Sequence, residues 1–130
     1  MTGGLLQQVT SLSSFALSID PKKIHAYLLD LTHVKGGPKA AFFLAFGFDR
    51  SAPIHLMDAL VDQARAAVNV SSRPHPRGYG IEISAVGVLN GLDGRSPTIL
   101  TAWNWIPDTT VSTGRTVLPL ATFVTARPAE

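Results

Sequence analysis

The sequence predicts an α+β fold in which N-terminal helices pack on a C-terminal antiparallel meander of three to four strands. Three observations support this class. Apolar residues recur at helical spacing in the first half of the chain, and they alternate with polar residues from residue 79 onwards. Between two alternating stretches, Asn90-Gly91 and Asp93-Gly94 form the strongest short-range signal of a hairpin.

The chain of 130 residues is long enough for one domain with its own core. We expect residues 1–8 to be flexible, residues 9–70 to be mainly helical and residues 79–128 to form the antiparallel sheet. Cysteine is absent, which excludes disulfides and thiolate chemistry, and the net charge of +2 is too small to indicate nucleic-acid binding by itself. No apolar run approaches the roughly 20 residues of a membrane span, and the N-terminus lacks the basic residues of a signal peptide. These features predict a cytoplasmic protein without membrane contact.

Alternation and capping signals predict the first elements. A short edge strand is expected within residues 9–19, where apolar and polar residues alternate. Asp20 as N-cap and Pro21 as first helical residue begin a helix over residues 21–31. Its apolar stripe comprises Ile24, Tyr27, Leu28 and Leu31.

Two further helices are predicted. The first runs from Pro38 to Gly47, where a left-handed residue closes it, and its apolar character on every side predicts burial. The second covers residues 53–69, with Ser51 as N-cap. Its apolar stripe comprises Ile54, Met57, Leu60, Val61, Ala64 and Val68.

The second half is predicted to be a loop followed by strands. Residues 71–78, SSRPHPRG, contain enough breakers to predict a loop. Strands follow over residues 79–89, with a bulge at Gly87, over residues 98–106 and over residues 116–126, where Pro119 indicates an edge or a bulge. Residues 107–115 are a polar excursion between the last two strands.

His33, Lys35 and Lys39 form the most suggestive polar group. A lysine in the first turn of a helix opposes the helix dipole, so it is poorly placed unless an anion such as phosphate lies nearby. A solvated lysine that turns away from the helix is the simpler interpretation. The other histidines lack the spacing of a metal site, and we predict no metal and no cofactor.

Later in the chain, Arg95 follows the predicted hairpin turn, from which it could reach a site on the sheet face. Trp103 shares a strand face with Thr101, which is typical of core packing and less often of a surface on which a base stacks.

The order of these motifs resembles a bacterial family of uncharacterised toxin-like domains. Its pattern contains a Y-L-L helix, H-x-x-G-x-x-K-A-x-F-F, D-G-R, T-x-W and V-T-A-x-P, which correspond here to residues 27–29, 33–43, 93–95, 101–103 and 124–128. The chain departs from the pattern at Gln63, where a histidine is common, and at Arg127, where a tyrosine is frequent. In layout it is also similar to the metal-independent ribonucleases of the barnase–EndoU–colicin–RelE group.

The resemblance implies a toxin domain of a toxin–antitoxin or conflict system that cleaves RNA without metal. Its catalytic residues would then be His33 as acid or base, Lys39 as the phosphate-stabilising cation, and the hydroxyls of Thr101 and Thr125. Lys35, Arg95 and Trp103 would bind the substrate. The implied partners are RNA and a cognate antitoxin or immunity protein, and homo-oligomerisation stays open.

Two alternatives remain at this stage. One is a non-catalytic partner-binding module, such as an immunity protein, an antitoxin or an assembly subunit, which the low charge and the apolar content favour. The other is an enzyme that uses the same cations on a small phosphorylated ligand or a nucleotide such as NAD.

Overall fold

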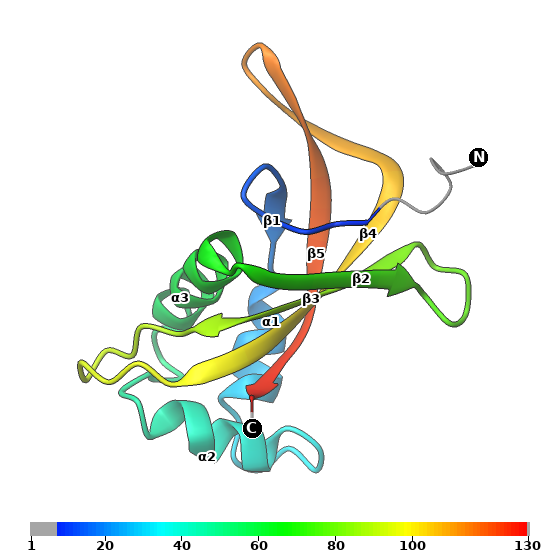
Figure 1. The fold of residues 1–130 in the computed structure, drawn as a ribbon. Coiled ribbons are helices and arrows are strands. Elements are labelled where there is room, and N and C mark those ends of the chain that lie inside the picture. The colour runs from blue at the N-terminus through cyan, green and yellow to red at the C-terminus, as the bar shows by residue number, and fades with distance from the viewer. Residues whose placement is uncertain (1–7, 130) are drawn as a thin grey trace.

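A computed structural model describes residues 8–129 and confirms the α+β class (Figure 1). Most of the segment predicted to be flexible, residues 1–7, lies outside the described residues. Within them, the helices precede four of the five strands, and the strands form one sheet in the order β1-β5-β4-β3-β2. No helix in this part of the chain is long and apolar enough to cross a membrane.

The sheet contains the predicted antiparallel meander and two further strands. The meander consists of β3 (Ile81–Val88), β4 (Thr98–Thr113) and β5 (Thr116–Pro128). The expected N-terminal edge strand is β1 (Ala16–Ser18), which runs parallel to β5 with Ala16 opposite Leu120. The other edge is β2 (Asn69–Pro74), which is antiparallel to β3. The sheet is therefore mixed: with β2 the antiparallel meander has four strands, within the predicted three to four, and β1 adds a parallel edge.

The prediction that residues 71–78 form a loop is wrong for its first half, because β2 continues to Pro74. Only Val70 and Ser72 of this strand are half-buried, whereas Asn69, Ser71 and Arg73 are exposed. An edge strand with one apolar side chain lacks the alternation by which strands are usually predicted. The segment is held by its ladder to β3.

The predicted first helix is shorter and changes its winding. Asp20 caps it as expected, since its carboxylate accepts a 2.9 Å hydrogen bond from the Lys22 backbone N–H. A single α-turn, α1 (Pro21–Lys23), then passes into a π-helical turn, η2 (Ile24–Leu28). Because the helix ends at Leu28, Leu31 lies outside it and is 60% exposed, which contradicts its predicted place in the apolar stripe.

Helix α2 (Gly37–Leu44) follows, with Pro38 in its first turn and Gly47 in the predicted left-handed conformation at φ +95°. It is not buried on every side as predicted. Ala40 and Phe43 are buried, whereas Ala41 is exposed and Phe42 and Leu44 are half-buried. One side of this apolar helix therefore faces solvent.

Helix α3 (Pro53–Ala66) is the longest helix described. Its N-cap is Ala52, and no side chain caps it, so the predicted role of Ser51 is wrong. The helix ends early because Ala67 is extended, which leaves Val68 95% exposed beside β2, and Ile54 at the other end is 52% exposed. Leu56, Ala59, Leu60 and Ala64 form the stripe that is buried against the sheet.

Gly87 lies in regular ladder pairs with Ile99, so the bulge predicted there is absent. A Cβ atom at Gly87 would meet the Ala67 Cβ at 3.4 Å, so glycine allows the end of α3 to approach β3 closely. The irregularity near Pro119 is present, but it lies in β4, between Trp105 and Thr110. Beyond it, the β4–β5 hairpin continues through the predicted polar excursion and projects from the rest of the molecule as the orange turn in Figure 1.

Candidate functional site

Four polar side chains, from η2, the loop that follows it, α2 and β5, meet near one end of β5, and we call them the Tyr27 cluster. They are Tyr27, His33, Lys39 and Thr125. The Lys39 ammonium donates hydrogen bonds of 2.9 Å to the Tyr27 Oη and 3.0 Å to the Thr125 Oγ1. It lies 5.2 Å from the centroid of the Tyr27 ring, and the His33 ring meets Tyr27 edge-on with centroids 4.9 Å apart.

The π-helical turn η2 positions Tyr27. In this turn the Leu29 N–H reaches back five residues to the Ile24 carbonyl at 2.8 Å. Such a turn holds one residue more than an α-turn and rotates the following side chains about the helix axis. Ile24 and Leu28 remain fully buried, while Tyr27 is only half-buried, which leaves its hydroxyl near the surface.

His33 is held by its own loop. Its Nδ1 accepts hydrogen bonds from the backbone N–H groups of Lys35 at 3.1 Å and Gly36 at 2.9 Å. Because Nδ1 accepts, the ring proton lies on Nε2. In this state His33 can donate a hydrogen bond through Nε2, but it cannot accept a proton there. The geometry thus suits a donor better than the predicted acid–base role.

Gly36 brings the start of α2 against Tyr27. A Cβ atom at this position would lie 2.4 Å from the Tyr27 carbonyl oxygen and 2.9 Å from its ring Cδ1. The backbone of Gly36 is ordinary right-handed helix, with φ −86°, so close packing and not conformational freedom requires glycine here. This contact gives a physical reason for the glycine between His33 and Lys39.

A β-bulge places Thr125. Along the β4–β5 ladder, Phe123 pairs with Trp103 and Thr125 pairs with the preceding residue, Ala102, so Val124 is an extra residue in β5. Bulges bend a strand and re-aim its side chains. At this bend the Thr125 hydroxyl accepts the hydrogen bond from Lys39.

The cluster changes the acidity of its phenol. The Lys39 ammonium, through its hydrogen bond, holds the pKa of Tyr27 below the ordinary value of 10.0. Partial burial of the ring acts in the opposite direction, while the Thr125 hydroxyl and the charges of Lys39 and Lys23 lower the pKa further. The ionised form of Tyr27 is thus easier to reach than that of a free tyrosine.

A hollow of about 310 Å³ adjoins the cluster and shares Tyr27 with it. Its other lining residues are Lys22, Lys23 and Val124, and we call it the lysine hollow. The Lys23 ammonium bonds the carbonyl oxygens of Phe123 at 3.4 Å and Val124 at 3.2 Å, beyond the part of β5 that pairs with β1. Among residues 8–129, no carboxylate lines this hollow.

All four lysines of the chain lie in this region, between residues 22 and 39. Lys35 belongs to the same loop as His33, but it is exposed and makes no side-chain hydrogen bond within residues 8–129. The nearest negative group on that loop is Asp30, whose carboxylate accepts two hydrogen bonds from Thr32 and lies 3.7 Å from Arg50. The lysine hollow is therefore a positively charged depression suited to an anion.

Two predicted site residues, Thr101 and Trp103, lie elsewhere, in a buried network around Gln63 of α3. The Trp103 Nε1 donates to the Thr101 Oγ1, and the Thr101 hydroxyl donates to the Gln63 Oε1, each at 2.8 Å. The Gln63 Nε2 donates to the carbonyls of Ala85 at 3.0 Å and Ile99 at 3.1 Å. Thr101 and Trp103 are both 0% exposed, so no base can stack on the indole in this structure. They join the sheet to α3.

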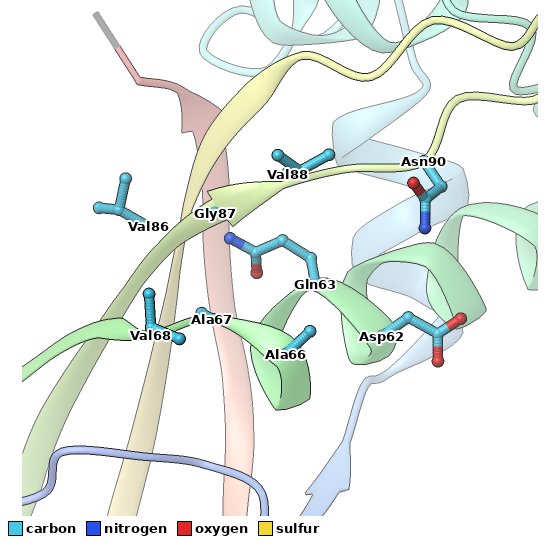
Figure 2. A pocket seen from close by; sticks show the side chains of 9 residues that line it. All are labelled: Asp62, Gln63, Ala66, Ala67, Val68, Val86, Gly87, Val88 and Asn90. Carbon is cyan, nitrogen blue, oxygen red and sulfur yellow. The ribbon is translucent and has the colours of Figure 1, made fainter.

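A second hollow, of about 320 Å³, lies between the end of α3 and β3 (Figure 2). Figure 2 shows the Gln63 side chain reaching from α3 toward Gly87, with Asp62 and Asn90 to one side. The amide of Gln63 is fully engaged in the buried network, and most of the other lining residues are alanines and valines. This hollow presents little reactive chemistry.

Arg95, which was predicted to bind substrate, connects the β3–β4 hairpin to the end of α2 through side-chain contacts. Its guanidinium pairs with Asp93, donates to the Ala45 carbonyl at the end of α2 and lies 4.6 Å from the centroid of the Phe46 ring. A cation at the C-terminus of a helix is favourably placed. The structure therefore gives Arg95 a structural contact away from the Tyr27 cluster.

Of the seven predicted site residues, the structure brings together His33, Lys39 and Thr125 and places Lys35 on the adjoining loop. Tyr27, Lys22 and Lys23 were missed. Tyr27 was assigned to an apolar stripe, although it begins the Y-L-L motif. Lys22 and Lys23 could have been found because every lysine of the sequence lies within residues 22–39. Within residues 8–129, no three His, Asp or Glu side chains converge to form a potential metal site.

A family model described as "Domain of unknown function (DUF6883)" matches residues 13–122. This range contains Tyr27, His33 and Lys39 and ends shortly before Thr125. No curated protein and no solved structure matches the chain.

Proposed function

We propose a metal-independent ribonuclease activity for this chain, which belongs to the DUF6883 family of domains of unknown function. One observation carries the proposal: the Lys39 ammonium bonds a phenol of lowered pKa, and that phenol lines a hollow with two more lysines. Cleavage of RNA needs a base for the 2′-OH and a cation for the charge that develops on phosphate. The Tyr27 cluster offers both groups.

The phosphate would lie in the lysine hollow. Lys22 and Lys23 line it, and Lys39 bonds the Tyr27 hydroxyl, so the group carries three positive charges around one phenol. A lysine ammonium has three protons, of which Lys39 uses two on Tyr27 and Thr125. The third is free to bind a phosphate oxygen. His33, whose ring lies edge-on to Tyr27, offers its Nε2–H as a further donor.

The phenolate of Tyr27 would act as the base. It takes the proton of the 2′-OH, the 2′-oxygen then bonds to phosphorus, and the bond from phosphorus to the 5′-oxygen breaks. Water in the open hollow protonates the leaving oxygen, and the hydroxide so formed returns Tyr27 to the phenolate. The products are a 2′,3′-cyclic phosphate and a 5′-hydroxyl.

The test is incubation of the purified protein with tRNA and total RNA in EDTA. We expect cleavage by the parent, and a loss of about 100-fold or more for Tyr27→Phe and Lys39→Met, since an acid–base group contributes about 10²–10⁴ in rate. Lys35→Met is the matched control, because it removes the same charge outside the hydrogen-bonded cluster. An inactive parent, or a Lys35→Met variant as impaired as Lys39→Met, would refute the assignment.

The wider proposal is that the activity serves as a toxin that a cognate antitoxin or immunity protein neutralises. Expression of the parent in bacteria should then arrest growth, and expression of Lys39→Met at the same level should not. Equal growth of both strains would remove the toxin role.

A partner-binding module is the second candidate, and the projecting β4–β5 hairpin favours it. Ile106 and Val117, near the base and tip of this projection, are 55% and 61% exposed. A tight stoichiometric complex in native mass measurements, formed equally by parent and Lys39→Met and without RNA cleavage, would select this candidate over the ribonuclease.

A further inference from the structure

We propose that the turn between β2 and β3 is a docking site for single-stranded RNA, formed by Tyr79, Arg77 and His75. This RNA class rests on the proposed function, although the turn is separate from the Tyr27 cluster. The turn is the green loop that extends from the sheet at the right of Figure 1.

The aromatic side chain of the turn is unusually open. Tyr79 is 61% exposed, and its ring lies 5.2 Å from the ring of His75 at an interplanar angle of 45°. A large exposed ring that packs on one neighbour leaves its other side available for a flat ligand. Nucleic-acid bases are such ligands, and stacking on aromatic side chains is the main sequence-tolerant contact with single strands.

The turn is held rigidly, so it can present this ring at low entropic cost. His75 N–H donates to the Gly80 carbonyl at 2.8 Å, and Gly78 N–H to the His75 carbonyl at 2.9 Å. The side chain of Asn104 donates to the Tyr79 carbonyl at 3.0 Å, which ties the turn to β4. Gly80, at φ +99°, passes so close to β4 that a Cβ atom would lie 2.5 Å from the Trp105 carbonyl oxygen.

The charge of the turn favours a polyanion. Residues 74–80 contain Arg77 and no acidic residue. Arg77 is exposed, and its side chain makes no hydrogen bond or ion pair within the described residues. The neighbouring Arg73 is paired with Glu82 at 2.7 Å, so it is already compensated. Arg77 is thus the cation that is available for a backbone phosphate beside a base stacked on Tyr79.

The β4–β5 hairpin provides an internal comparison. It too projects and carries an exposed arginine, Arg115, but residues 107–118 contain no aromatic side chain. Replacing Arg115 therefore changes the net charge as replacing Arg77 does, on a turn without a stacking surface.

The test is fluorescence anisotropy with a labelled single-stranded 2′-O-methyl RNA, which cannot be cleaved because its 2′-oxygen is blocked. We expect Tyr79→Ala to weaken binding by about 5- to 150-fold, the range for loss of one stacked base, and Tyr79→Phe to bind as the parent does. Arg77→Ala should reduce the salt dependence of binding by about one counterion, and Arg115→Ala should leave it unchanged.

Three results would overturn the inference: unchanged binding by Tyr79→Ala, an equal effect of Arg115→Ala and Arg77→Ala, or full competition by polyglutamate, which would indicate an acidic protein partner. The docking site and the ribonuclease activity can fail separately in these experiments. Tyr79-dependent binding with no cleavage by the parent refutes the ribonuclease alone, and cleavage with Tyr79-independent binding refutes the docking site alone.

Discussion

Replacement of Thr101 by valine tests whether the network around Gln63 is structural. The hydroxyl accepts from Trp103 Nε1 and donates to Gln63 Oε1, and both partners are at least 98% buried. Valine keeps the side-chain shape and leaves one donor and one acceptor without a partner. Each buried group left in this way costs about 1–3 kcal/mol, so we expect Thr101→Val to lower the free energy of unfolding by roughly 2–6 kcal/mol.

Urea denaturation measures this loss, and Thr98→Val is the control because Thr98 is an exposed threonine of the same strand. The control should change the free energy of unfolding by less than about 0.5 kcal/mol. In a Trp103→Phe background, Thr101→Val should cost less, since the indole N–H is no longer left unpaired. A loss below about 1 kcal/mol in the parent background, smaller than one unsatisfied buried group, would refute the structural interpretation and return Thr101 to the candidate site residues.

Of three further predictions, two concern the phenol of Tyr27 and one concerns the close packing of the β2–β3 turn. The variant Tyr79→Phe leaves Tyr27 as the only tyrosine, so ultraviolet titration of this variant should show the Tyr27 phenolate forming below pH 10.0. Adding Lys39→Met should move this transition to higher pH. An unchanged transition would contradict Lys39 as the cause of the lowered pKa. Because the pKa of Tyr27 is lower in the folded state, its ionisation stabilises the fold above about pH 10, and this stabilisation is lost as the pH falls through the folded pKa. Urea titration of Tyr27→Phe and its parent at several pH values measures this difference. Gly80→Ala should lower the urea midpoint more than Gly78→Ala, because both have positive φ but only the former meets the Trp105 carbonyl at 2.5 Å; equal midpoints would contradict the clash.

The features that were predicted correctly from the sequence share a local cause. Asp20 caps because a carboxylate before a proline is a local helix signal, and Gly47 is left-handed because the helix before it must end. The hairpin over residues 90–95 follows from its own turn residues, and the Gly91 N–H bonds the Arg95 carbonyl at 2.9 Å. These signals act within a few residues, so one sequence is enough to interpret them.

The features that were missed depend on contacts distant in the sequence. The helical spacing of Tyr27 is the same whether its side chain packs in the core or belongs to a site. Its place in the structure is set by the π-helical turn and by the hydrogen bond from Lys39. Thr125 reaches Lys39 because of the β-bulge at Val124, for which the sequence of β5 contains no local signal. The resemblance implied that Trp103 binds substrate, whereas its N–H donates to the Thr101 hydroxyl in the core, in line with the core packing that its strand position also indicated. Side-chain orientation at these places is set by tertiary packing, which local propensity cannot give.

The parallel pairing of β1 with β5 has a consequence for the order of events during synthesis. Ala16 can pair only with Leu120 of β5, and the Lys23 ammonium bonds the carbonyl of Phe123, 100 residues further along the chain. Contacts this distant in sequence form slowly, and a nascent chain cannot complete that edge of the sheet until residues 120–122 of β5 have been translated. The Thr125 end of the candidate site is equally late. The contact between Lys39 and Thr125 can therefore form only after 86 further residues have been translated beyond Lys39.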